Sequence, residues 1–169
     1  MKVSKLQAAH RQLNVAIRLH LLEDDPVAVL TLAGAASRVF GDLVGQTKPD
    51  RWWDRKAWEA TGISKRDYME VMRRGQNFLK HADRDANDTL EWSASDSESL
   101  MFFATLNAGE IDGISPSQQV FQLWFIALNS GIFTPGFEMA KIALEYFPGI
   151  LAMSESEQRK AGAKRLLEA

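Results

Sequence analysis

The segment RRGQNFLKHADRD, residues 73–85, holds the side chains of this sequence best suited to acid-base or phosphate chemistry. If the segment forms an α-helix at about 100° per residue, Arg74, Asn77 and His81 lie on one face, at spacings of three, four and seven residues. Arg84 joins this face if the helix continues that far. A guanidinium is a permanent two-pronged partner for a phosphate, and an imidazole titrates near neutral pH and can transfer protons. The opposite, apolar face, which we expect in the core, consists of Tyr68, Val71, Met72, Gly75, Phe78, Leu79 and Ala82.

RNA cleavage by general acid-base catalysis is the reaction that suits this group of side chains. His81 would handle the proton of the 2′-hydroxyl or of the leaving group, while Arg74 would stabilise the charge that develops on phosphorus. Such a reaction needs no metal ion or other cofactor. Arg73, Lys80 and Arg84 are the candidate contacts to nucleic acid. An alternative remains open, in which these side chains only make an exposed helix face soluble or form hydrogen bonds to a neighbouring loop.

The string NFLKH, residues 77–81, together with Arg74 and the helical pattern around it, resembles the HEPN superfamily. RNase members of that superfamily carry an Arg, a polar residue and a His in an R-x4-6-H motif, and here six residues separate Arg74 from His81. The resemblance covers about residues 4–85. It implies a homodimer that places two motifs across a shared cleft, with Arg74 and His81 as the catalytic pair and Asn77 as a polar helper.

Two features depart from the commonest form of this motif. The spacing is at the long end of the range, and Gln76 precedes Asn77 where the commonest form has Arg. Many members of the superfamily are also non-catalytic and act as antitoxins, nucleotide binders or scaffolds. The strings DPVAVLTLAGAA and NFLKHADRD are similar to a set of uncharacterised bacterial proteins as well. The resemblance therefore leaves open whether the chain is an enzyme.

The other histidines and carboxylates give weaker candidates for a site. His81, Asp83 and Asp85 have the chemistry of metal ligands, but an H-x-D-x-D string in a polar loop is common. No second histidine lies at a helical ligand spacing from His81, so we predict no metal site. His10 and His20, ten residues apart on the first predicted helix, are expected at the surface.

The segment RWWDRKAW, residues 51–58, interleaves bases with aromatic side chains. Such a segment could stack on RNA bases, but three tryptophans are also what a short connection uses to pack against a bundle, and we favour packing. Glycine-rich phosphate loops, a G-x-S-x-G elbow and an H-E-x-x-H zinc helix are absent from the sequence. The sequence therefore gives no support to the enzyme classes that depend on those motifs.

Composition indicates one ordinary globular domain, residues 1–169. The formal charge of -2 gives the chain no general attraction to nucleic acid or anionic lipid, so any polyanion site must be local. The chain has no cysteine, which fits a reducing interior. Charged residues and histidines interrupt the first 22 residues, so we expect no membrane segment and a cytoplasmic protein.

Apolar residues recur every three or four positions along most of the chain, which predicts an all-α bundle of about five to seven helices. Asp25 before Pro26 and Ser115 before Pro116 are typical helix starts, and Ser95 or Asp96 could cap another helix. Residues 118–131 are apolar nearly all round and are expected to form the central helix. The remaining helices are expected near 4–22, 27–44, 65–79, 97–108, 135–147 and after 154, with 51–62 as a short helix or coil.

Two functions follow from these patterns. One is a HEPN-like homodimer that handles RNA or nucleotides, acting as a metal-independent RNase. The other is a non-catalytic helical interaction or scaffold module with a protein partner, also a homodimer. The first predicts accessible Arg74 and His81 on a basic groove, and the second predicts Asn77 and His81 buried with their polar atoms satisfied.

Overall fold

The computed structural model describes residues 2–81, 83, 86–134 and 136–169, and over these residues the chain is helical with no strand. This confirms the all-α bundle. The segment expected as a short helix or coil is helical, so eight α-helices are present in the described part of the chain. They are α1 (Lys5–Leu21), α2 (Pro26–Thr47), α3 (Trp53–Thr61), α4 (Lys65–Lys80), α6 (Ala94–Ile111), α7 (Pro116–Leu128), α8 (Glu138–Tyr146) and α9 (Glu155–Glu168). Three short 3-10 helices span Pro49–Arg51, Ser130–Ile132 and Ile150–Ala152.

Most helix starts follow from the capping residues. The Asp25 carboxylate accepts a hydrogen bond from the Ala28 backbone N–H at 2.9 Å, and Pro26 takes the first position of α2. The start of α6 differs from expectation, because Ser93 is its N-cap. Asp96 lies three residues further on and accepts from the Ser93 backbone N–H at 2.8 Å. Asp96 therefore supports this helix end without being its cap.

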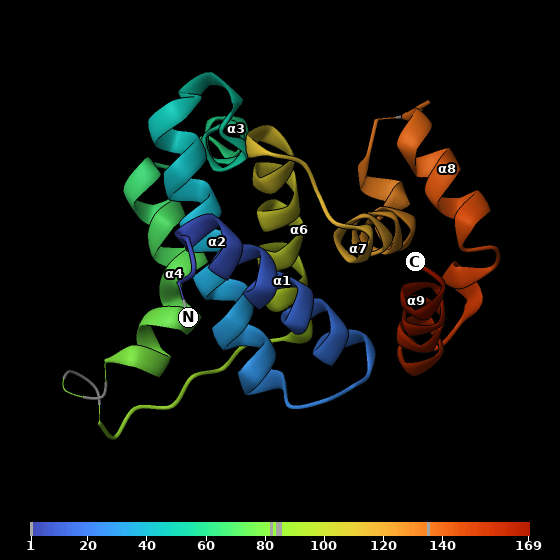
Figure 1. The fold of residues 1–169 in the computed structure, drawn as a ribbon, viewed down its shortest axis with the longest axis horizontal. Helices are drawn as coiled ribbons and strands as arrows, with labels where there is room; N and C mark the ends of the chain where they lie inside the picture. Colours follow the sequence, from blue (N-terminus) through green and yellow to red (C-terminus); the bar gives the residue numbers. More distant parts are fainter. Residues whose placement is uncertain (1, 82, 84–85, 135) are drawn as a thin grey trace.

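Helix α2 contacts α1, α4 and α6 and forms the centre of one half of the molecule. Phe40 and Val44 on α2 are fully buried. By length and composition α2 is the one helix in the described residues that could cross a membrane, and here it is a core helix. Helix α7, which the sequence suggested as central, contacts α1, α6, α8 and α9 and buries Phe121 and Trp124. Figure 1 shows α4 at one edge of the molecule and α8 and α9 at the opposite edge.

The buried face of α4 differs from the predicted apolar stripe. Tyr68 and Gln76 are buried, whereas Val71 is 70% exposed. The reason is the docking of α4 on α2, where a Cβ added at Gly34 would meet the Gln76 Cβ at 3.1 Å. Gly34 leaves room for a polar side chain, so tertiary packing rotates α4 away from the orientation that hydrophobicity alone favours.

Candidate functional site

Arg74, Asn77 and His81 lie along one groove on the outer side of α4, as their helical spacing predicts. The groove has a volume of about 710 Å³ and is also lined by residues 88–90, which follow α4 in the chain. Arg74 and Asn77 are exposed, and 40% of the His81 side chain is exposed. The three side chains are therefore open to a ligand, and the burial expected for a purely structural role of Asn77 and His81 is wrong.

The ends of α4 determine where these side chains lie. Ser64 caps the helix, accepting from the Asp67 backbone N–H at 3.1 Å. The helix ends at Lys80, and His81 follows with φ -121° and ψ 52°. A rise of 1.5 Å per residue separates Arg74 from His81 by about 10 Å along the axis. A guanidinium and an imidazole on one face at that separation can approach a single phosphate from two sides.

The groove is not basic, contrary to the expectation for an RNA site. Asp67, Glu70 and Asp88 line it together with Arg74 and His81. Glu70 lies one helical turn before Arg74 on the same face, a spacing of four that was readable in the sequence. The remaining lining residues are Val71, Phe78, Thr89 and Leu90.

Two of the three predicted nucleic-acid contacts, Arg73 and Lys80, do not line the groove. Arg73 points to the other side of α4, with its Nη2 4.0 Å from the Asp42 Oδ1, and burial lowers the pKa of Arg73. Lys80 is exposed but outside the groove lining. Arg84 lies outside the described residues, so its predicted role is neither supported nor opposed.

The positions of the side chains give little support to the alternative that His81, Asp83 and Asp85 bind a metal ion. The His81 Nδ1 lies 3.9 Å from the Asp83 Oδ1, and Asp85 is outside the described residues. Within the part of the chain that the structure describes, no three histidine or acidic side chains are grouped as metal ligands.

A second cavity of about 290 Å³ adjoins the groove between α4, α2 and α6. Val71, Arg74 and Leu90 line both spaces, so the two share part of their walls. The second cavity is mainly apolar, and its further lining residues are Leu30, Met72, Gly75, Glu91, Trp92, Asp96, Ser99 and Leu100.

A buried polar cluster lies beneath α4. The Asp54 Oδ2 accepts hydrogen bonds from Trp52 Nε1 and from Asn107 Nδ2, both at 2.8 Å. Burial raises the pKa of Asp54, and these two hydrogen bonds oppose that rise. Trp52 also packs on Gly45, where an added Cβ would meet the ring at 3.1 Å, as expected of a segment pinned to the bundle. The Gln76 Nε2 is buried near this cluster without a hydrogen-bond partner.

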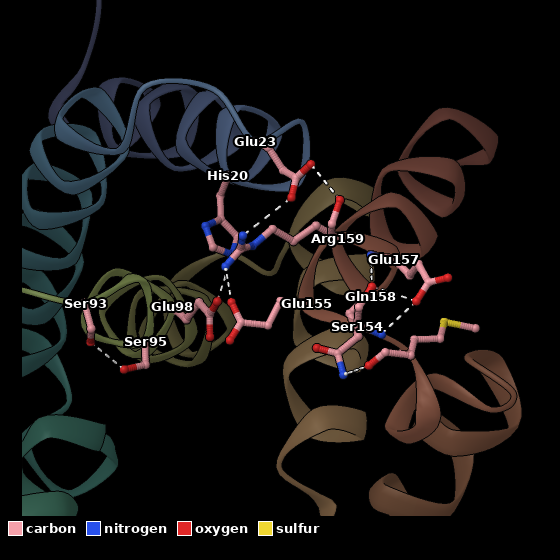
Figure 2. A network of polar contacts seen from close by, with 12 residues as sticks. His20, Glu23, Ser93, Ser95, Glu98, Ser154, Glu155, Glu157, Gln158 and Arg159 are labelled. Atoms are coloured by element: carbon pink, nitrogen blue, oxygen red, sulfur yellow. Dashed lines mark hydrogen bonds and ion pairs between the residues drawn. The ribbon is translucent and has the colours of Figure 1, made fainter.

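His20 is buried, with 7% exposure, so its predicted surface position is wrong. It follows Leu13 and Ile17 on the apolar stripe of α1, a spacing that was visible in the sequence. Its Nε2 lies 3.0 Å from the Glu98 Oε1, the distance of an ion pair, although the ring N–H is not aligned for a hydrogen bond. Figure 2 shows Arg159 from α9 beside this pair.

Arg159 extends this network to two further carboxylates. Its Nη1 lies 3.6 Å from the Glu23 Oε1, and its Nη2 lies 3.4 Å from the Glu155 Oε2. The His20 ring also meets the Trp124 ring edge-on at 5.6 Å. These contacts join α1, α6, α7 and α9. Because the charged side chains pair with one another, we interpret the network as a structural junction between helices. His10 is partly exposed, with its Nε2 3.0 Å from the Asp112 Oδ1.

Comparisons with known proteins add no relative. No protein-family model, curated protein or solved structure matches this chain.

Proposed function

We propose that the α4 groove is the functional site and that it handles RNA or a nucleotide in the cytoplasm, as a HEPN-like, metal-independent RNase. The observation that carries the proposal is the exposure of Arg74, Asn77 and His81 along one groove. The side chains offer a permanent cation for phosphate, an amide for hydrogen bonding and an imidazole that can transfer protons.

In the proposed reaction the ribose 2′-hydroxyl attacks the adjacent phosphorus and the 5′-oxygen leaves. Neutral His81 accepts the proton of the attacking hydroxyl, or protonated His81 donates one to the leaving oxygen. Arg74 stabilises the negative charge on the equatorial oxygens. The bond from phosphorus to the 5′-oxygen breaks as the bond to the 2′-oxygen forms, which leaves a 2′,3′-cyclic phosphate.

One imidazole can carry only one of the two proton transfers in a single step. Glu70 is a potential second group, but 11 residues at 1.5 Å each place it about 16 Å from His81 along the axis. That separation is too large for both to act on one phosphate. A second His81, from another copy of the chain, would complete the pair, and the proposed homodimer is the form in which we expect cleavage.

A second candidate function is binding of a protein partner without catalysis. The observation that favours it is the set of carboxylates in the groove, Asp67, Glu70 and Asp88, next to the apolar side chains of Val71 and Phe78. Carboxylates repel an RNA backbone and attract lysine or arginine, so this lining suits a basic, partly apolar peptide segment.

RNA cleavage in EDTA separates the two functions. A panel of single-stranded and structured RNAs is incubated with the wild type and with Arg74→Ala, His81→Ala and Arg66→Ala. Arg66 is a matched control, because it is exposed on the same helix but outside the groove. We expect cleavage by the wild type and Arg66→Ala, and a loss of about 100-fold or more in the other two variants. An intact RNA panel with equally folded proteins would refute the RNase and leave the partner-binding function.

A further inference from the structure

The cavity beside the groove extends the site beyond the phosphate position. Arg74, Val71 and Leu90 line both spaces, so a ligand whose phosphate contacts Arg74 lies beside the second cavity. Its volume of about 290 Å³ is near the lower end of the range for small-molecule pockets. A phosphate alone does not fill such a space, which instead suits an apolar or planar group attached to the phosphate.

Trp92 gives the cavity an aromatic wall. It is partly buried and follows the loop of residues 88–91, just before α6. Among the described residues, none of the aromatic pairs involves the Trp92 ring. Leu30 and Met72 line the same cavity on the α2 and α4 sides. A planar ring bound here could stack on the indole with aliphatic groups around it.

Besides Arg74, this cavity is lined by three polar side chains that can accept hydrogen bonds. Glu91, Asp96 and Ser99 line it, and one carboxylate oxygen of Asp96 already accepts from the Ser93 backbone. Carboxylates pair with amino groups on the edges of bases. Adenine, guanine and cytosine carry such an amino group and uracil does not, and the two purines fill more of the volume.

We propose that the cavity lined by Trp92 binds a purine base of the RNA or nucleotide whose phosphate contacts Arg74. This inference rests on the proposed function of the groove and names its ligand class. Gly75 contributes by letting α4 approach α2, since an added Cβ would lie 2.9 Å from the Leu30 Cδ2. The close approach brings Leu30 to the cavity wall.

The test is calorimetric titration of the folded chain with adenosine 5′-monophosphate, guanosine 5′-monophosphate, uridine 5′-monophosphate and ribose 5-phosphate. We expect a purine nucleotide to bind about 5- to 150-fold more tightly than ribose 5-phosphate, because one stacked base contributes about 1–3 kcal/mol. Trp92→Leu should remove this advantage. Trp53→Leu is the matched control, because Trp53 is partly buried but lines neither space.

A second variant protects the test against misfolding of Trp92→Leu. Ser99→Phe fills the cavity from α6 and should weaken the purine nucleotides to the level of ribose 5-phosphate, while Arg74→Ala should weaken every ligand. Equal wild-type binding of all four ligands, sensitive to Arg74→Ala, would overturn the base cavity and leave the phosphate site intact. No binding of any ligand would overturn both the cavity and the proposed nucleotide function.

Discussion

Replacement of Asn107 by alanine tests the polar cluster that holds α3 on α6. Asn107 is fully buried. Its Nδ2 donates to the Asp54 Oδ2 at 2.8 Å, and its Oδ1 accepts from the Trp53 backbone N–H at 3.2 Å. Alanine removes both partners. A hydrogen bond to a charged group contributes about 1.5–3 kcal/mol and an orphaned buried donor costs about 1–3 kcal/mol, so we expect a loss of about 3–5 kcal/mol.

The assay is urea unfolding at several pH values, with a thermal scan for comparison. At this chain length each kcal/mol lowers the Tm by about 2–4 °C, so the variant should melt about 6–20 °C below the wild type. The pKa of Asp54, already raised by burial, should rise further once the Asn107 donor is gone. The variant's penalty should therefore be greater at pH 7 than in acid, where Asp54 is protonated.

Asn129→Ala is the matched control for this prediction. Asn129 is half-buried, and its Nδ2 makes one hydrogen bond to the Phe125 carbonyl at 2.9 Å. Its removal should cost about 1 kcal/mol, with no dependence on Asp54 titration. A loss below about 1 kcal/mol for Asn107→Ala, or the same penalty at acidic and neutral pH, would refute the reasoning about the cluster.

Two further changes address the titration of the cluster and the packing of α9. Because burial raises the pKa of Asp54, its contribution to stability is present in acid and is lost as pH rises through the folded-state pKa. Asp54→Asn keeps an oxygen that can accept from both donors, but it cannot titrate. In urea unfolding at several pH values, the free energy of unfolding of this variant should fall less with rising pH than that of the wild type. An unchanged pH dependence would mean that another group is responsible. In Gly162→Ala, the new Cβ would lie 2.7 Å from the Leu21 Cδ2 and 3.0 Å from the Trp124 Cδ1. Overpacking of about 1–3 kcal/mol should outweigh the helix-propensity gain of about 1 kcal/mol, and a Tm increase in a thermal scan would contradict this.

The arrangement of the groove was predictable because it depends on local geometry. The spacing of Arg74, Asn77 and His81 puts them on one side of any α-helix, and Ser64 marks where that helix begins. Helix periodicity alone therefore identified three side chains that lie in one groove. The position of Glu70 on this face could also be predicted from the sequence, because Glu70 lies one helical turn from Arg74.

The remaining features depend on contacts between distant segments. Asp88 faces the groove only because the loop after α4 returns beside it, and Arg73 turns away because α4 docks against the part of α2 that carries Asp42. The partner of buried His20 is likewise remote in the sequence, because Glu98 comes from α6. No local pattern contains these pairings, so the contribution of Asp88 to the groove and the absence of Arg73 from it could not be read from the sequence.

In the proposed function, His81 and Arg74 promote attack of a ribose 2′-hydroxyl on the adjacent phosphate. The most direct measurement is the identity of the product ends after cleavage in EDTA, using an RNA and the same RNA with a single 2′-deoxy substitution at its cleavage site. We expect a 2′,3′-cyclic phosphate from the RNA, no cleavage at the deoxy position and at least about 100-fold less product from His81→Ala. Cleavage at the deoxy position, or undiminished cleavage by His81→Ala, would contradict it.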